Sequence, residues 1–465
     1  MIPQIIRPKN VTPKPPPIVI PLGKPAENTV ATPGVRNFTS FTKNTSILPT
    51  KLPPLTPHAH ILVDLNPLLQ RIDMNTKYEL VQLVFFQDEV EDPEIKKKTE
   101  TLSNILKLMN DPIYRHGVSN DIFISIFQLC TSHIFRNSIR LQDRNEFSEV
   151  KIMYRITNQE HLKICHQLLR ALMLDHSTFT SLLTSSLCKS LVNSLDTPVL
   201  EEQQQFEETI KLIIESYIGQ RHDILHYMTD QIIAYYDNVN QYSSIAPILR
   251  LFFSYYTSLQ PPMKQSAFLT FRTVFYPLYS TPYAYNFEQA LSELSLFFQI
   301  QDPATTFWCL KYLYMHWPKA NPKKINTFLN QLTNILPYLP EGVFQASAPL
   351  ILQSFANVIS SPHVATCVNA IIYCNNEQFL QAFKNVPQLV VQYLLPAVKS
   401  AIDIWKNDAR ELASQLRSKL TTFERSKQAK EIPPTKDTKA IWSSIADIAK
   451  TNDDSLNNWR IDDTL

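Results

Sequence analysis

Apolar residues recur every three or four positions along most of this chain, and this spacing places them on one face of an α-helix. The run from 322 to 336 shows the pattern at Ile325, Phe328, Leu329, Leu332, Ile335 and Leu336. Helix-length runs of this kind begin at about residue 76, with YELVQLVFFQDEV, and follow one another almost to the end. No sustained strand-like alternation interrupts them. The pattern predicts an all-α protein.

The breaks between these runs share one form, a capping residue followed by proline. Asp, Asn and Ser accept hydrogen bonds from the free amides of a first helical turn, and proline lacks the amide that would go unused there. Five pairs fit: Asp92-Pro93, Asp111-Pro112, Asp302-Pro303, Asn321-Pro322 and Ser361-Pro362. In MHWPKANPKKIN, Trp317-Pro318 is expected to end one helix, because proline disfavours helix at the residue before it.

The predicted helical hairpins begin at nearly even intervals. Their first residues lie near Glu160, Glu201, Tyr242, Tyr283, Pro322 and Pro362, which gives intervals of 41, 41, 41, 39 and 40 residues. A period near 40 with two helices per unit is typical of HEAT or armadillo repeats. The expected fold is a superhelical solenoid of antiparallel helix pairs with a concave groove, an architecture that binds other proteins.

Composition divides the chain into three parts. Residues 1–60 hold 13 of the 33 prolines, with seven Lys or Arg against one acid, and predict a disordered, basic, Pro-rich arm. A HEAT-like solenoid is expected over residues 75–430. Residues 431–465 are expected to form a linker, a short helix and a tail.

Composition also argues against a nucleotide-binding enzyme of the usual kinds. The chain has only 5 glycines and no glycine-rich phosphate loop. Its six cysteines are scattered, which predicts reduced core thiols rather than disulfides or a metal site. His222 and His226 lie four apart but lack a third ligand, so surface histidines are the better interpretation, and the same holds for the HAH at 58–60. We expect no catalysis, no metal and no cofactor.

The sequence gives little reason to expect a membrane or nucleic-acid partner. No apolar run approaches the roughly 18 residues that a membrane span needs. The aromatic clusters LRLFFSYYTSL and YPLYSTPYAYNF contain few basic residues, and aromatic helix faces of this kind usually belong to a core. The first ten residues lack a signal-peptide apolar segment. A soluble cytoplasmic or nuclear protein is therefore expected.

Two stretches, HWPKANPKKINTFLNQLTNIL and VISSPHVATCVNAIIYCNNEQFL, resemble the B-prime family of regulatory subunits of protein phosphatase 2A. The family has a Tyr-Trp-Pro-Lys joint, a Phe-Leu-Asn-Glu-Leu helix, Ser-Ser-Pro-His and Trp-Asn-Asn-Glu. The counterparts here are His316–Lys319, Phe328–Leu332, Ser360–His363 and Cys374–Glu377. The likeness extends over about residues 76–450, and it marks this chain as a divergent member.

The resemblance implies a non-catalytic HEAT-like subunit that joins a scaffold subunit to a Ser/Thr phosphatase catalytic subunit. Such subunits select substrate proteins through a short motif, roughly Leu-x-x-Ile-x-Glu, held in the concave groove. The groove residues carried over by the resemblance are Lys211, Arg221, Leu251, Tyr255 and Lys264.

Several of these groove positions depart from the family. Lys211-Leu212 stands where the family has a His-Arg pair that meets the acidic side chain of the motif. Ile214 replaces a usual tyrosine, Ala267 replaces a histidine, and Tyr255 replaces a smaller isoleucine. A lone lysine lacks the bidentate fork of arginine. The departures predict an altered motif preference.

Two other classes of protein fit the same pattern. A helical-repeat scaffold or transport adaptor, such as a karyopherin-like carrier, would share the solenoid without the phosphatase. An enzyme with a site assembled from dispersed residues is the third alternative. Association with a phosphatase catalytic subunit separates the first hypothesis from the second.

Overall fold

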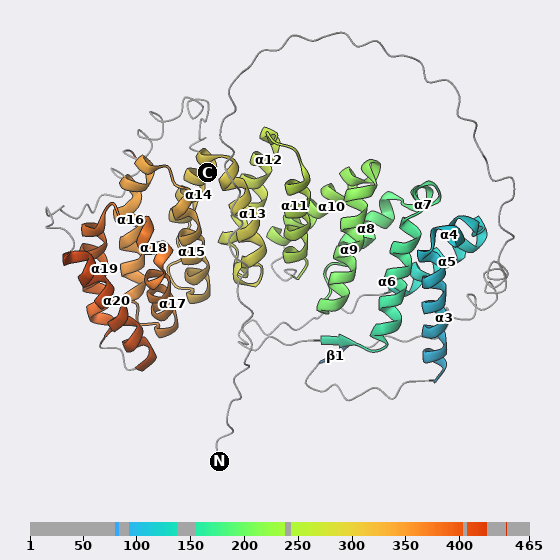
Figure 1. The fold of residues 1–465 in the computed structure, drawn as a ribbon, viewed down its shortest axis with the longest axis horizontal. Helices are drawn as coiled ribbons and strands as arrows, with labels where there is room; N and C mark the ends of the chain where they lie inside the picture. Colours follow the sequence, from blue (N-terminus) through green and yellow to red (C-terminus); the bar gives the residue numbers. More distant parts are fainter. Residues whose placement is uncertain are drawn as a thin grey trace, which may run out of the picture. The chain divides into compact units, whose positions relative to one another are not determined.

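The described part of the chain is almost entirely helical (Figure 1). In the computed structural model, the described residues are 80–82, 93–136, 154–237, 243–402, 407–425 and Ser443. The predicted all-α class is therefore confirmed for this part. The Pro-rich arm at 1–60, the HAH at 58–60 and, apart from Ser443, the C-terminal segment 431–465 lie outside it.

Most of the described helices follow one another through short connections. The first ten are α3 (Pro93–Asn110), α4 (Pro112–Gly117), α5 (Asn120–Ile134), α6 (Gln159–Met173), α7 (His176–Leu182), α8 (Ser185–Asn193), α9 (Leu200–Ser216), α10 (Ile218–Asp237), α11 (Ile245–Ser258) and α12 (Gln265–Thr270). A π-helical turn η2 (Phe271–Phe275) and two 3-10 turns, η3 (Tyr276–Ser280) and η4 (Ala284–Asn286), continue the chain. The remainder is α13 (Glu288–Gln301), α14 (Pro303–Met315), α15 (Pro322–Ile335), η5 (Leu336–Tyr338), α16 (Glu341–Ile359), α17 (Val364–Asn375), α18 (Glu377–Ala382), α19 (Pro387–Ala401) and α20 (Asn407–Arg425).

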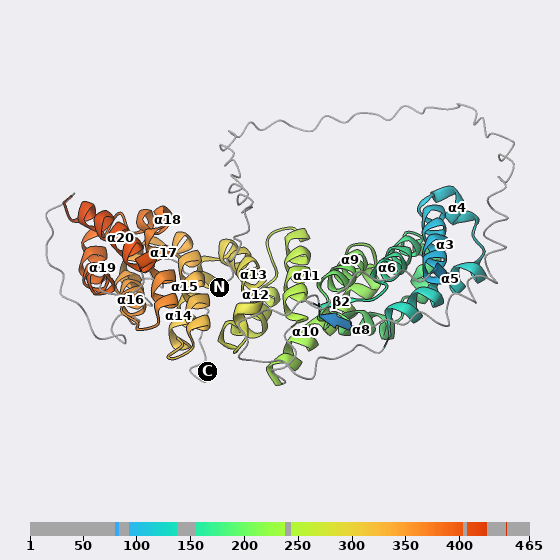
Figure 2. The same ribbon diagram turned by 90° about the horizontal axis from the view of Figure 1, so that it is seen from below.

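The helices pack in consecutive pairs, and each pair packs on the next. One row of contacts runs from α6 through α9, α11, α13, α15 and α17 to α20. The partner helices α8, α10, α14, α16 and α19 pack against this row, as the turned view in Figure 2 also shows. Every pair thereby buries its apolar faces against its neighbours, which is how a helical repeat builds a continuous core.

The predicted repeat is confirmed, although its period is less even than the sequence suggests. The first helices of the pairs begin at Gln159, Leu200, Ile245, Glu288, Pro322 and Val364. Hydrogen bonds between neighbouring pairs have the same spacing. Gln203 Nε2 donates to the Ser243 carbonyl 40 residues away, and Asn330 Nδ2 donates to Glu288 Oε1 42 residues away.

Capping by residues before proline is confirmed at α14 and α15. The Asp302 carboxylate accepts from the amides of Ala304 and Thr305, and Asn321 Oδ1 accepts from the Lys324 amide at 3.2 Å. The predicted cap at Ser361 is wrong. Helix α17 begins two residues later, and His363 Nδ1 accepts from the Thr366 amide. Trp317-Pro318 follows the end of α14, as predicted.

A strand pair replaces the helix expected near residue 76. Strand β1 (Leu80–Gln82) pairs antiparallel with β2 (Tyr154–Ile156), and Val81 lies opposite Arg155. The YELVQLVFF run is rich in aromatic and β-branched residues, and a run this short does not distinguish helix from strand. The strand forms because residues some 70 positions away pair with it, and a short sequence window does not contain these residues. The first described helix therefore begins at Pro93.

Most aromatic side chains of the two clusters belong to the core, as expected, and the buried ones are Phe252, Tyr256, Tyr276, Tyr279 and Phe287. Phe271 and Phe298 stack with ring centroids 4.5 Å apart, and Tyr276 lies edge-on to Phe271. All three side chains are fully buried, so their faces are not available as a stacking platform for bases.

Helix α16 corrects the expectation that no run is apolar enough to cross a membrane. Among the described residues, Glu341–Ile359 meets the length and composition of a span, with a mean hydropathy of 1.2. More than half of its apolar window is buried inside the protein, where it packs against α17 and α19. A helix that other helices cover on several sides needs apolar residues all round. The burial therefore indicates a core helix rather than a membrane span.

Candidate functional site

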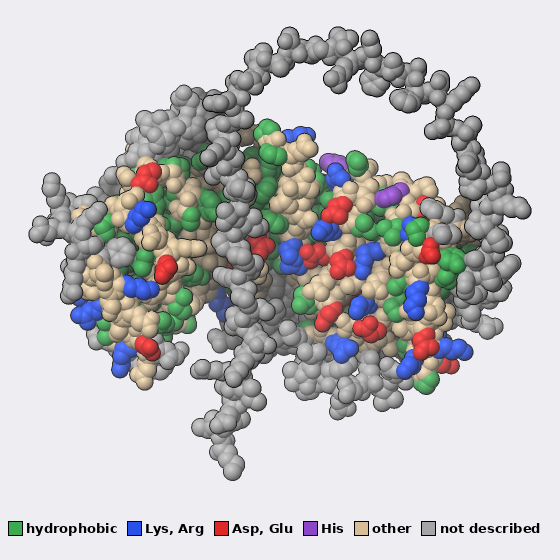
Figure 3. Space-filling view, viewed as in Figure 1, with side chains coloured by type: hydrophobic (Ala, Val, Ile, Leu, Met, Phe, Trp, Pro, Cys, Tyr) green, Lys and Arg blue, Asp and Glu red, His purple; other side chains and the backbone are tan. Residues whose placement is uncertain are grey.

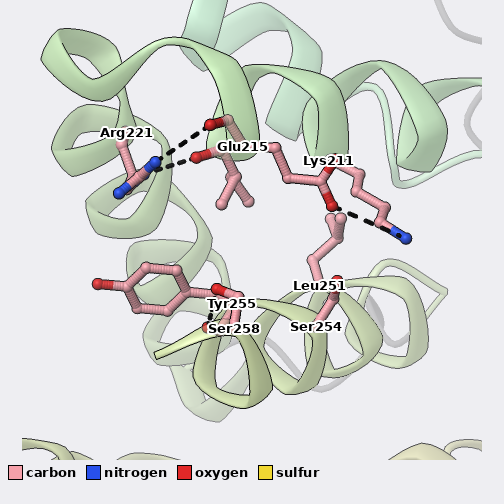
Figure 4. Close-up of a pocket in the computed structure, with 8 residues that line it drawn as sticks. Lys211, Glu215, Arg221, Leu251, Ser254, Tyr255 and Ser258 are labelled. Carbon is pink, nitrogen blue, oxygen red and sulfur yellow. Dashed lines mark hydrogen bonds and ion pairs between the residues drawn. The ribbon is translucent and has the colours of Figure 1, made fainter. Parts of the chain in front are cut away.

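A pocket of about 150 Å³ opens between α9 and α11, the first helices of two adjacent pairs (Figure 4). Its lining residues are Lys211, Ile214, Glu215, Arg221, Leu251, Ser254, Tyr255 and Ser258. The site thus draws on two stretches of the chain some 40 residues apart.

Helical spacing explains why these side chains meet. On α9, Lys211, Ile214 and Glu215 are separated by three and four residues, so they share one face. Leu251, Ser254, Tyr255 and Ser258 repeat that spacing on α11. The pocket lies between these two faces, near the C-terminal ends of both helices.

The floor of the pocket is apolar and buried. Leu251 is 2% exposed and Ile214 is 5% exposed, so both belong to the core. The Tyr255 ring is partly buried and packs beside Tyr256, with centroids 5.3 Å apart. The tyrosine occupies part of the wall that a smaller side chain would leave open.

Arg221, from the first turn of α10, closes one end of the pocket by capping α9. Its Nε donates to the carbonyl of Ile214 at 2.6 Å, and its Nη2 donates to the carbonyl of Glu215 at 3.3 Å. A cation at the C-terminal end of a helix satisfies free carbonyls and the negative end of the helix dipole. The sharp turn between the helices is held by Tyr217, whose hydroxyl donates to the Met173 carbonyl at 2.5 Å.

The spacing between α9 and α11 is set by an ion pair below the pocket. Arg250 donates through Nε and Nη2 to both carboxylate oxygens of Glu207, at distances between 2.6 and 3.2 Å. Bidentate pairs of this kind fix geometry as well as adding energy. They hold Leu251, the next residue, against the face of α9.

A second, weaker ion pair lies at the rim. Lys211 Nζ is 3.9 Å from Glu215 Oε1, and the two side chains are 52% and 54% exposed. In Figure 4 this pair and Arg221 lie on opposite sides of the opening. The pocket therefore contains two cations and one carboxylate around an apolar floor.

Four of the five residues proposed from the sequence line this single pocket: Lys211, Arg221, Leu251 and Tyr255. Lys264 does not line it. This lysine is exposed and precedes α12 as its N-cap residue. Three lining residues were missed, namely Glu215, Ser254 and Ser258. Their helical spacing from Lys211 and Leu251 was the signal that could have found them.

The pocket combines an apolar floor with charged and hydroxyl groups at its rim. No cysteine lines it, and all six cysteines are free and buried. Burial raises the pKa of Cys165 to about 12 and that of Cys309 to about 12, so these thiols stay protonated. Across the described ranges, no group of three or more His, Cys, Asp or Glu could hold a metal ion. His222 and His226 are exposed on α10, as predicted.

The surface around the helices carries mixed charge. On the face drawn in Figure 3, Lys and Arg side chains alternate with Asp and Glu, without a continuous basic stripe. A nucleic-acid interface normally gathers positive charge on one face. The face in view thus lacks that signature.

The fold is that of a helical-repeat protein. A family model described as protein phosphatase 2A regulatory B subunit (B56 family) matches residues 74–449. The chain belongs to this family, which is the B-prime family that the sequence motifs resemble. B56 regulatory subunits are non-catalytic.

Individual relatives are distant. The delta isoform of the 56 kDa regulatory subunit of Saccharomyces cerevisiae is 23% identical over 209 residues, which cover 45% of this chain and 28% of the relative. The human delta isoform is 20% identical over 275 residues, which cover 57% of this chain and 46% of the relative. The B' beta subunit of Arabidopsis thaliana is 21% identical over 253 residues, which cover 54% of this chain and 51% of the relative. The chain spans about half or less of the length of these relatives.

Proposed function

We propose that this protein is a regulatory subunit of protein phosphatase 2A that joins the scaffold and catalytic subunits and directs them to substrate proteins. Substrates bind as extended peptides in the groove that contains the pocket between α9 and α11. The assembly acts in the cytoplasm, the nucleus or both, and it needs no cofactor in this subunit.

The family match over residues 74–449 carries the proposal, because it covers all of the described helices. The pocket adds independent support. It has an apolar floor from Leu251 and Ile214 and charged or hydroxyl groups at the rim, the composition that a peptide side chain requires.

Partner recovery tests the assembly. Affinity purification of the full chain from its own cells should recover scaffold and catalytic phosphatase subunits in stoichiometric amounts, identified by mass spectrometry. Recovery of a transport GTPase or cargo proteins instead would support the helical-repeat adaptor. Absence of phosphatase subunits around a well-folded chain would overturn the proposal.

Peptide binding tests the groove. A Leu-x-x-Ile-x-Glu peptide should bind about tenfold to a thousandfold more weakly here than to the human delta subunit, since two donors at about 1–2 kcal/mol each are replaced. Fluorescence polarisation with both proteins measures the difference. Affinity equal to that of the human subunit, and unchanged by Arg221→Ala, would contradict the mapped pocket.

A blocking substitution tests the same pocket without removing a cap. Ser258→Trp adds a large ring at an exposed lining position and should abolish binding of any peptide that enters. Ser266→Trp, at an exposed position of α12 outside the lining, is the matched control and should leave binding unchanged. Equal binding by both variants would place the peptide elsewhere.

A further inference from the structure

Glu215 gives the pocket a carboxylate that is poised to compete with a ligand. It lies one helical turn after Lys211 on the pocket face of α9, with its Oε1 3.9 Å from Lys211 Nζ. Within the described part of the chain, neither side chain makes another hydrogen bond or ion pair. Glu215 therefore occupies the position beside Lys211 that an acidic ligand group would need.

The pair is weak enough for a ligand to displace either member. Both side chains are about half exposed, and an ion pair of that exposure contributes little. The order along the helix, with Lys preceding Glu by four residues, is also the less favourable one. A charged ligand group can therefore exchange with Glu215 or with Lys211.

The surrounding backbone decides which exchange is favoured. Helix α9 ends at Ser216 and α11 ends at Ser258, so both helices bring their partially negative C-terminal ends to the pocket. The Arg221 charge offsets one of these ends, because its Nε and Nη2 are committed to the carbonyls of Ile214 and Glu215. The Glu215 carboxylate and the two helix ends together offset the charges of Lys211 and Arg221, so little net positive charge is left to attract an incoming anion.

We propose that Glu215 is a specificity-determining residue that makes the pocket reject an acidic side chain beside the apolar anchor and accept a basic or neutral one. The anchor rests on Leu251, Ile214 and the Tyr255 ring. A lysine or arginine of the ligand then forms an ion pair with the Glu215 carboxylate. A neutral ligand residue leaves the Lys211–Glu215 pair intact. This inference rests on the proposed peptide-binding function of the same pocket.

The test uses three fluorescein-labelled peptides, Leu-x-x-Ile-x-Z, in which Z is Glu, Gln or Lys. The wild-type chain should bind the Lys and Gln peptides more tightly than the Glu peptide. Glu215→Gln should reverse the order, with the Glu peptide gaining about two- to fivefold and the Lys peptide losing a similar factor. Glu201→Gln, at an exposed position in the first turn of α9, should change none of the affinities.

The outcomes separate this inference from the proposed function. Tightest binding of the Glu peptide by both wild type and Glu215→Gln would overturn the role of Glu215 and leave peptide binding standing. Failure of all three peptides to bind, with phosphatase subunits still recovered, would overturn the pocket as a peptide site and the inference with it. Raised salt should shrink the differences between the peptides, because exposed charges are screened.

Discussion

Two buried histidines of α6 have strongly lowered pKa values. His166 is fully buried with its ring edge-on to Phe206, and neither ring nitrogen has a hydrogen-bond partner among the residues that the structure describes. Burial, reinforced by Arg170 and Arg136, lowers the pKa of His166 to about 3. Burial, with His133 and Lys98 nearby, lowers the pKa of His161 to about 4.

These shifts predict acid-induced destabilisation. The unfolded chain protonates both histidines as the pH falls through 6.5, whereas the folded chain keeps them neutral until about pH 4 or below. The unfolded state then binds more protons, so each histidine costs about 1.4 kcal/mol per pH unit in this window. Denaturation series at pH 7.5, 6, 5 and 4.5 measure the slope of the unfolding free energy.

A substitution at the same site isolates the contribution of one ring. His166→Phe keeps an aromatic side chain against Phe206 and removes the titrating group. We expect its slope between pH 6.5 and 5 to be smaller by about 1.4 kcal/mol per pH unit than that of the wild type. An identical slope in both proteins would show that His166 is protonated in the folded state or does not contribute.

At the scale of single helices, the proline-linked caps differ in strength. Asn321→Ala removes the side-chain acceptor for the Lys324 amide and should destabilise the protein by about 1 kcal/mol. Ser361→Ala is the matched control, because His363 caps α17 and Ser361 accepts only from the His363 amide. Denaturant midpoints compare the two. Equal losses would mean that Ser361 caps α17 after all.

At the scale of the whole molecule, stability depends on bonds between neighbouring pairs. Glu288 on α13 accepts from Thr327 Oγ1 at 2.9 Å and from Asn330 Nδ2 at 2.6 Å, both on α15. Glu288→Ala leaves these partly buried groups without their acceptor and should cost about 1–3 kcal/mol. Hydrogen exchange should quicken in both α13 and α15. Quickening confined to α13 would show that the pairs are uncoupled there.

Much of the fold follows from local sequence. The three-and-four spacing of apolar residues, the Asp302 and Asn321 caps and the period near 40 residues are properties of adjacent positions along the chain. A helix forms its hydrogen bonds within one stretch, so a window of some 20 residues contains most of the information that places it. The helix pairs and their order could therefore be predicted before the structure.

Contacts between distant residues could not be predicted in this way. The β1–β2 pairing joins residues some 70 positions apart, and it changed a helix prediction into a strand. The His363 cap moved the start of α17, because side-chain geometry at the joint decides which group reaches the first amides. Both cases depend on contacts that form only when the chain has folded.

The pocket shows the same division. The sequence, by its likeness to a family, placed Lys211, Arg221, Leu251 and Tyr255 in a groove, and the structure gathers them around one pocket. Only the tertiary structure joined the C-terminal ends of α9 and α11, bound Arg221 to carbonyls and set Glu215 against Lys211. Helix formation is governed by neighbours in sequence, whereas the charge balance of a pocket depends on which helices pack together.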